Sequence, residues 1–204
     1  IDAVLLRPLP YDEPDRLVRL IERSLPRFPS FSVSPGHYLF WREHATAFEG
    51  IGAWAAQSVN LETGGADPDR VRADRVSANL FTLLGVQPVV GRGFEANDEQ
   101  GERARVALVS YGAWQRRFGG DPAVVGQTVL MDRHPVTIVG VMPEFLKVPS
   151  RQTEFWVPIV FTDAERRSFG SHFMGAVARL KPGMTREAAA ADMQAVSRRL
   201  IEFN

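Results

Sequence analysis

Residues 110–145, SYGAWQRRFGGDPAVVGQTVLMDRHPVTIVGVMPEF, decide how the middle of this chain folds. Ser110 is a residue type that favours the position just before a helix, and the aromatic side chains that follow it at helical spacing would share one face. Gly119 can supply the left-handed residue that ends this helix. Asp121-Pro122 then starts one more helical turn, which ends at Gly126.

The second half of the same stretch predicts a β-hairpin. Two apolar runs, 128–131 and 136–142, flank a turn at Asp132-Arg133-His134. Pro135 cannot donate a backbone hydrogen bond, so it fits only at the start of a strand. Since no catalytic motif is evident here, the stretch predicts a shape rather than a chemistry.

The composition excludes several classes of function. The 204 residues are enough for one large domain or two small ones, and the 24 basic residues balance the 24 acidic ones, so the net charge does not indicate a nucleic-acid partner. The chain has no cysteine, which excludes disulfides, thiolate metal sites and cysteine nucleophiles. The apolar runs are far shorter than the roughly 20 residues that a membrane helix needs. The sequence begins at Ile1 rather than Met, so we expect any membrane attachment to lie outside it.

Strands and helices are mixed without regular alternation, which predicts an α+β fold. Residues 16–23 alternate as a strand, with Val18, Leu20 and Glu22 on one side. Ser34-Pro35 predicts the start of a helix whose apolar stripe continues as far as Phe48. The other expected elements are extended segments at 51–63, 70–77, 105–109, 156–160 and 173–180, a short helix at 79–84, and a final helix capped by Thr185.

None of the histidines forms a recognisable site. His37 and His44 lie seven residues apart on the first predicted helix, whereas helical zinc pairs are four residues apart, and no third ligand is apparent. His134 falls in the hairpin turn, where exposure is the ordinary state, and His172 has no nucleophile motif near it. We therefore predict no metal site and no cofactor.

Ser110 follows a strand and opens a helix, as a hydrolase nucleophile does. The local sequence LVSYG lacks the first glycine of a nucleophile elbow, and an N-cap explains the serine equally well. We predict the cap, and with it no catalytic residue.

Glycine-rich and charged segments give no stronger candidate. Gly85 and the Gly91-Arg92-Gly93 run lack the lysine-serine ending of a phosphate-binding loop. The acidic residues nearby do not have the spacing of a helix-loop-helix calcium site, so we predict a solvated loop. They are Glu95, Asp98, Glu99 and Glu102. The Arg116-Arg117 pair beside Trp114 and Phe118 is weak evidence for nucleic-acid stacking, because such an aromatic stripe is more often core.

The motifs that remain resemble a known family. The segment 114–126, WQRRFGGDPAVVG, followed by the hairpin and IVGVMP at 138–143, resembles the MacB-like periplasmic core domain of permease subunits in type VII, FtsX-like ABC transporters. Further matching segments are VLLRPLP at 4–10 with PDRL at 14–17, SANLF at 77–81 with LGV at 84–86, GRGF at 91–94, and ARLKPG at 178–183. The resemblance is strongest to permeases in which the domain occurs in duplicate, often without an ATPase of their own.

The resemblance implies an extracytoplasmic domain inserted between the first and second membrane helices of a permease. It implies a porter-like subdomain of mixed strands and helices, which would comprise residues 1–84 and 155–204. An inserted sheet-rich, Sabre-like subdomain would comprise residues 85–154. Ile1–Leu6 would be the outer end of the first membrane helix, and the strand that usually follows the family's last helix is not within this sequence.

We therefore predict a non-catalytic extracytoplasmic domain of an inner-membrane ABC transporter permease, which couples ATP-driven helix motion to export or mechanotransmission. The implied partners are a cytoplasmic ABC ATPase, a second permease copy or pseudo-dimer partner, and a periplasmic adaptor or cargo, with no nucleic acid. Two alternatives stay open: a periplasmic ligand-binding or sensor domain, and a secreted hydrolase that uses Ser110 or a histidine.

Overall fold

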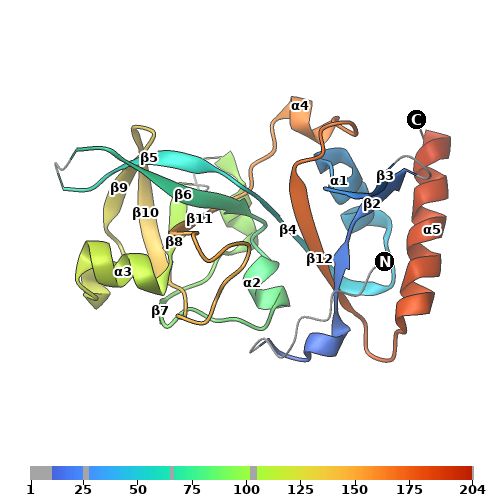
Figure 1. Cartoon of the computed structure of the whole chain (residues 1–204), viewed down its shortest axis with the longest axis horizontal. Coiled ribbons are helices and arrows are strands. Elements are labelled where there is room, and N and C mark those ends of the chain that lie inside the picture. The colour runs from blue at the N-terminus through green and yellow to red at the C-terminus, as the bar shows by residue number, and fades with distance from the viewer. Residues whose placement is uncertain (1–10, 25–27, 65–66, 102–104, 204) are drawn as a thin grey trace. The chain divides into compact units, whose positions relative to one another are not determined.

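The computed structural model describes residues 11–24, 28–64, 67–101 and 105–203. It shows mixed helices and strands, as predicted from the sequence (Figure 1). The chain forms two compact units. Unit 1 comprises Ile1–Ala53, Leu83–Gly85 and Phe161–Asn204, and unit 2 comprises Trp54–Thr82 and Val86–Val160. In the described part, no helix is both long and apolar enough to span a bilayer.

Unit 1 combines a short antiparallel sheet with helices. Its elements are η1 (Pro14–Arg16), β1 (Leu17–Leu20), β2 (Glu22–Ser24), β3 (Phe28–Phe31), α1 (Pro35–His44), β4 (Phe48–Ala55, which ends in unit 2), α4 (Asp163–Arg166), β12 (Met174–Leu180) and α5 (Arg186–Phe203). β12 lies between β1 and β4, and β2 pairs with β3. The predicted apolar stripe of α5 is buried at Ala189, Val196 and Leu200.

The first helix is shorter than predicted. α1 ends at His44, and Phe48 begins β4 instead of extending the apolar stripe. The reason lies far away in the sequence: the carboxylate of Asp192 in α5 accepts hydrogen bonds from the backbone N–H groups of Thr46 and Ala47, at 2.8 and 3.0 Å. These bonds hold the connection extended, because they take the donors that a longer helix would need.

The segment Leu83–Gly85 belongs to unit 1, although the residues before and after it belong to unit 2. It contains the end of α2 (Leu80–Leu83) and the predicted stop at Gly85, whose φ is 71°. The buried guanidinium of Arg179 in β12 donates to the carbonyl of Leu83 at 2.8 Å and to that of Asp12 at 2.7 Å. A Cβ on Gly85 would lie 2.4 Å from the Cβ of Asp12, so only glycine fits this contact.

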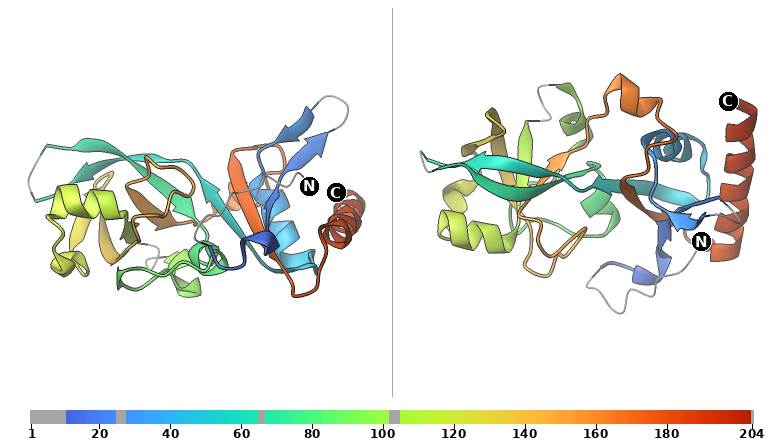
Figure 2. Two further views of the ribbon diagram at one scale, coloured as in Figure 1. Left: turned by 60° about the horizontal axis from the view of Figure 1, so that its bottom comes forward. Right: turned by 45° about the horizontal axis from the view of Figure 1, so that its top comes forward.

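Unit 2 is built mainly of strands. Its elements after β4 are β5 (Ser58–Glu62), β6 (Asp69–Val76), most of α2, β7 (Val90–Gly91), η2 (Ala96–Glu99), β8 (Val106–Val109), α3 (Tyr111–Phe118), η4 (Pro122–Val124), β9 (Thr128–Met131), β10 (His134–Val141) and β11 (Phe155–Pro158). The hairpin of β5 and β6 is the long cyan-to-green ribbon in Figures 1 and 2.

The strand pairing in unit 2 closes on itself. From β6 it passes through β11, β8, β10 and β9 to β5, and β5 pairs with β6 again. Side chains alternate between the two faces of a strand, so one row from each strand points into the ring. These rows form the core together with Ala113 and Trp114 of α3 and Val124 of η4. Since α3 follows directly after β8, it covers the end of the ring where β8 finishes.

Residues 110–145 form the predicted helix, helical turn and hairpin. The Ser110 hydroxyl accepts a hydrogen bond from the Ala113 N–H, and Gly119 adopts φ 63° after the helix. Asp121 caps η4. The hairpin turn is tighter than predicted, because only Asp132 and Arg133 lie in it, with φ of 48° and 67°, the pattern of a type I′ turn. His134 already pairs with Met131 as the first residue of β10.

The compact units divide the chain differently from the predicted 84/85 boundary. Trp54–Thr82 groups with unit 2, because β5 and β6 complete its ring of strands. Whether the two units correspond to the porter-like and Sabre-like subdomains stays a proposal.

Candidate functional site

A group of titratable and polar side chains from distant parts of the sequence surrounds the buried Glu22 of β2 in unit 1. This carboxylate is 7% exposed. One of its oxygens, Oε1, accepts hydrogen bonds from the backbone N–H and the hydroxyl of Ser34, at 2.6 and 3.1 Å. Ser34 lies at the N-cap position of α1, as predicted, but its hydroxyl donates to Glu22 and does not cap the helix.

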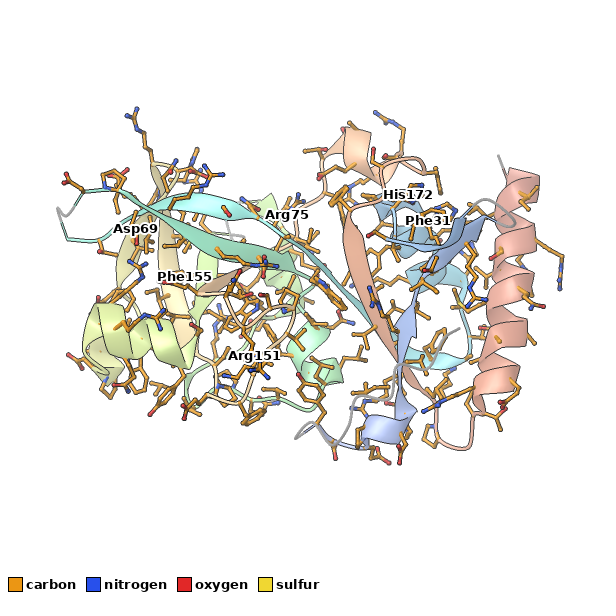
Figure 3. The ribbon with its side chains drawn as sticks, in the orientation of Figure 1. Phe31, Asp69, Arg75, Arg151, Phe155 and His172 are labelled. Carbon is orange, nitrogen blue, oxygen red and sulfur yellow. The ribbon has the colours of Figure 1, made fainter. Side chains whose placement is uncertain are left out.

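Two histidines from distant parts of the sequence meet the other oxygen. Nδ1 of His37 lies 3.1 Å from Oε2 of Glu22, and Nδ1 of His172 lies 3.3 Å from the same atom. The imidazoles are stacked with centroids 6.5 Å apart. Phe31 packs edge-on against His172, as Figure 3 shows, and Phe169 packs edge-on against His37. We call Glu22, Ser34, His37 and His172 the Glu22 cluster.

The surroundings favour the charged form of Glu22. Burial by itself raises the pKa of a carboxyl group, but the hydrogen bonds from His37 and from the Ser34 N–H, with the nearby histidine charges, lower the pKa of Glu22 overall. The cluster therefore ties β2 to the start of α1 and to the segment before β12 through an ionised carboxylate.

The geometry of the cluster differs from that of a hydrolase triad. In a triad, the serine meets one ring nitrogen of the histidine and the acid meets the other. Here Ser34 Oγ, at 2.7 Å, and Glu22 both approach Nδ1 of His37. The serine is thus not placed to lose its proton to an oriented imidazole, and the arrangement supports structure rather than acyl transfer.

The cluster borders a hollow of about 580 Å³ in unit 1. Glu22 and His37 line it on one side, with Trp41 of α1 beside them. The other side is one face of α5, which includes Met193 and Ile201. The walls are mixed polar and apolar, and Ile201 is 78% exposed.

The remaining histidines lie elsewhere. Nδ1 of His44 is 3.0 Å from the Phe40 carbonyl oxygen, and its ring stacks on Phe40 with centroids 4.0 Å apart. His134 is exposed, as expected for its place next to the hairpin turn. Within the described ranges, no group of three or more His, Asp or Glu side chains is arranged to hold a metal ion.

Ser110 is placed as a helix cap. Its hydroxyl accepts from the Ala113 N–H at 3.2 Å, and its own N–H donates to the Glu154 carbonyl at 2.8 Å. In the described part of the chain it has no hydrogen bond to a histidine. The bonds that Ser110 makes are thus those of a helix cap.

The glycine and acid-rich loop is held by internal bonds. Gly91 packs so closely on β10 that a Cβ would lie 2.3 Å from the Val139 carbonyl oxygen. Asp98 pairs with Arg92 at 2.7 Å, and Glu99 accepts from the Ala78 N–H at 2.7 Å. Glu102 lies outside the described residues. The carboxylates seen in this loop thus fix the loop itself.

Arg116 and Arg117 on α3 form ion pairs with acidic residues of unit 2. Arg117 bridges Glu154 at 2.5 Å and Asp69 at 2.6 Å, and Arg116 meets Glu154 at 3.2 Å. The hydrogen bond to Glu154 is the main reason why the pKa of Arg117 rises above its ordinary value. Trp114 is 8% exposed, so it is core rather than a stacking platform.

Sequence reasoning missed the meeting of Glu22 with His37 and His172. One signal was present: the strand alternation put Glu22 on the same side as Val18 and Leu20, both of which are buried. An acid on a buried face needs partners. Nothing local identified those partners, because His172 lies 150 residues further along the chain.

Comparison with known proteins gives the family. Residues 11–196 match the MacB-like periplasmic core domain. The chain belongs to this family. As a MacB-like periplasmic core domain, it is the part of an ABC transporter permease that lies outside the membrane.

Relatives of this MacB-like domain are larger export proteins. SyfD of Pseudomonas syringae pv. tomato, assigned as a syringafactin export ATP-binding/permease protein, is 24% identical over 185 residues, which cover 89% of this chain and 26% of SyfD. The chain spans only 18–26% of the length of the curated relatives that it matches.

Solved structures share the fold. A domain assigned to a permease protein of Porphyromonas gingivalis superposes with a TM-score of 0.73 at 19% identity, over 93% of this chain and 86% of that one. The periplasmic region of MacB from Actinobacillus actinomycetemcomitans gives a TM-score of 0.64 at 12% identity, over 90% of this chain and 83% of that one.

Proposed function

We propose that this domain is a non-catalytic coupling element of an ABC transporter permease in the cytoplasmic membrane. It would receive movement of the membrane helices, driven by ATP hydrolysis on the cytoplasmic side, and pass that movement to cargo or to an adaptor outside. The observation that carries the proposal is the family match over residues 11–196.

The organisation of the chain supports a mechanical role. The first and last described residues both belong to unit 1, so segments that join the domain to membrane helices would attach to that unit. The Glu22 cluster and Arg179 tie the strands of unit 1 to α1, to the segment before β12 and to Leu83–Gly85. Such bonds stiffen the unit that would be pulled.

The partners follow from the relatives. SyfD is named as an ATP-binding/permease protein, so its name joins ATP binding and the permease in one protein. We propose an ABC ATPase as the partner here, as part of the same protein or as a separate subunit. A second permease copy or pseudo-dimer partner and an outer adaptor or cargo complete the proposed assembly.

Label distances in the reconstituted permease test the proposal. This chain has no cysteine, so spin labels attach within it only at introduced positions. We suggest Arg198→Cys in unit 1 with Arg133→Cys in unit 2, both exposed, in the full permease with its ATPase in nanodiscs. The expected result is a distance distribution that changes between the ATP-bound and nucleotide-free states.

The matched control carries both labels in unit 2, at Gln115→Cys and Arg133→Cys, and its distances should stay constant. Distances that stay the same between the units while ATP-driven export continues would contradict the coupling role. ATP-independent hydrolysis of an ester or peptide by the domain would contradict its non-catalytic character.

A further inference from the structure

The ring of strands in unit 2 is joined by a short pairing between β5 and β9. The two strands pair at Leu61 with Met131 and at Glu62 with Leu130. Each strand pairs over more residues with its other neighbour, β5 with β6 and β9 with β10. Figure 1 shows the two resulting hairpins beside each other. We call the pairing of β5 with β9 the seam, and it joins two hairpins that are better paired internally than to each other.

The seam is also exposed to water. The pairing of β8 with β11 is equally short, but its side chains are at most 1% exposed. At the seam, Glu62 and Leu130 are half-buried, and Asn60 and Asp132 at its end are exposed. Water competes for hydrogen bonds at such positions, so they open at a lower free energy than bonds in the core. The seam is therefore the weaker of the two short pairings.

Asp132 lengthens the seam with its side chain. Its N–H donates to the Asn60 carbonyl at 2.9 Å, and its Oδ1 accepts from the N–H and the side-chain amide of Asn60, at 2.9 and 3.0 Å. In an ordinary antiparallel pair, a backbone carbonyl would accept that N–H. Asp132 already lies in the hairpin turn, with φ 48°, and its carboxylate takes the place of the carbonyl. We call Asn60 and Asp132 the latch.

We propose that the ring of unit 2 opens at the seam and that the latch holds it closed. Opening would separate the hairpin of β5 and β6 from the hairpin of β9 and β10, while each hairpin keeps its own pairing. It would free backbone donors and acceptors of β5 and β9. It would also uncover Leu61 and Met131, which are 2% and 5% exposed in the closed ring. The opening concerns unit 2 alone and does not depend on the coupling role, so either proposal can fail without the other.

Amide hydrogen exchange of the 204-residue chain, followed residue by residue by NMR at low urea concentrations, tests the opening. Hydrogen-bonded pairs alternate along an antiparallel ladder, so the amides of Glu62 and Leu130 report on the seam. The reference is the amide of Met142, which is fully buried and donates to the Val109 carbonyl at 2.9 Å.

We expect the seam amides to be protected at least about tenfold less than the Met142 amide. Their exchange should also depend less on urea, because opening the seam exposes less surface than unfolding the unit. Equal protection and equal urea dependence would mean that the seam opens only when the whole unit unfolds, and this result would overturn the proposal.

Variants of the hairpin turn test the latch. Asp132→Gly keeps the type I′ turn, which accepts glycine, but removes the carboxylate. It should speed exchange at Glu62 and Leu130 about tenfold. Asp132→Asn keeps the turn and a side-chain acceptor, so its exchange should stay within about threefold of the unmodified chain.

Arg133→Gly is the matched control, because it places a glycine in the same turn and leaves the latch intact. Exchange at the seam should stay within about threefold of the unmodified chain. The latch is refuted if Asp132→Gly exchanges as slowly as the unmodified chain, or if Arg133→Gly speeds exchange as much as Asp132→Gly does.

A disulfide across the seam keeps the proposal testable where Asp132→Gly does not fold. The chain has no cysteine, so Leu61→Cys with Met131→Cys supplies a single possible bridge. These residues lie directly opposite each other, in the closely spaced kind of antiparallel pair that a disulfide can span. Oxidation should slow exchange at Glu62 and Leu130 at least about tenfold relative to the reduced form. Equal rates in the two forms would show that the seam does not open.

Discussion

Unit 1 and unit 2 both contain a nearly inaccessible carboxylate, and they hold it in different ways. In unit 2, Asp74 is fully buried, accepts hydrogen bonds from Arg72 Nε at 2.9 Å and from Gln57 N at 3.3 Å, and receives the hydroxyl of Thr153 at 2.5 Å. In unit 1, Glu22 is held by His37, His172 and Ser34.

The difference lies in the partners. Asp74 meets the guanidinium of Arg72, whose Nε donates to both carboxylate oxygens at 2.9 Å. Glu22 instead meets two imidazoles together with the N–H and hydroxyl of Ser34, and its pKa is lowered although burial alone would raise it. Unit 2 therefore holds its buried acid with a guanidinium and a hydroxyl, whereas unit 1 holds its acid with two imidazoles and the serine that precedes α1.

The largest expected effect concerns the pair of Asp74 and Arg72. Asp74→Ala should lower the free energy of unfolding of the chain by about 3 kcal/mol, because it leaves Arg72 and Thr153 without their buried acceptor. Urea denaturation measures this. Asp69→Ala on the same strand removes an exposed partner of Arg117 and should cost less than about 1 kcal/mol. Equal losses in the two variants would show that Asp74 has no special role.

The next largest effect concerns the Glu22 cluster. Glu22→Gln keeps the size of the side chain but removes its charge, so at neutral pH it should lower the free energy of unfolding by about 2 kcal/mol. Thermal unfolding followed by circular dichroism measures this. A Glu22→Gln variant as stable as the unmodified chain would show that the histidines and Ser34 do not need the carboxylate.

The pH dependence of the stability tests the role of Glu22 further. Because the folded chain lowers the pKa of Glu22 below its ordinary 4.5, the stabilisation is complete above that value and is lost as the pH falls through the folded pKa. The difference in stability between the unmodified chain and Glu22→Gln should therefore shrink in acid. Denaturation series at several acid pH values measure it, and a constant difference would contradict the assignment.

The smallest effect compares the serine caps. The Ser110 hydroxyl accepts a hydrogen bond from the Ala113 N–H of its own helix, whereas the Ser34 hydroxyl donates to Glu22. Ser110→Ala should cost about 1 kcal/mol of stability, the ordinary value of a lost cap. Ser58→Ala, at an exposed strand position, should stay within about 0.5 kcal/mol. If Ser110→Ala abolished a hydrolytic activity while stability stayed unchanged, the cap interpretation would be wrong.

Much of the fold could be predicted because its causes are local. The Ser110 cap, the Gly119 stop, the Asp121 restart and the hairpin each depend on a few neighbouring residues. The prediction of α1 up to Phe48 was wrong because the extended connection depends on Asp192, a residue of another helix. The same limit applies to the Glu22 cluster, whose members come together only through pairing of strands distant in sequence.

The ring of strands in unit 2 shows the limit in another form. Alternation along each strand predicts which residues share a face, but the order of the strands does not follow from local patterns. The cap at Ser110 could be argued from the sequence, whereas the closure of the ring needed the structure.

The closed pairing in unit 2 also decides how this unit can meet other chains. Many transport and adaptor proteins capture an extended peptide by adding it as one more strand to an open sheet. In the described part of unit 2, every strand of the ring has a neighbour on either side, so the ring offers no open edge to such a peptide. The same closure leaves the ring without an open edge at which two copies could pair and aggregate. A partner that binds the ring itself would therefore be recognised through side chains and loops rather than through backbone.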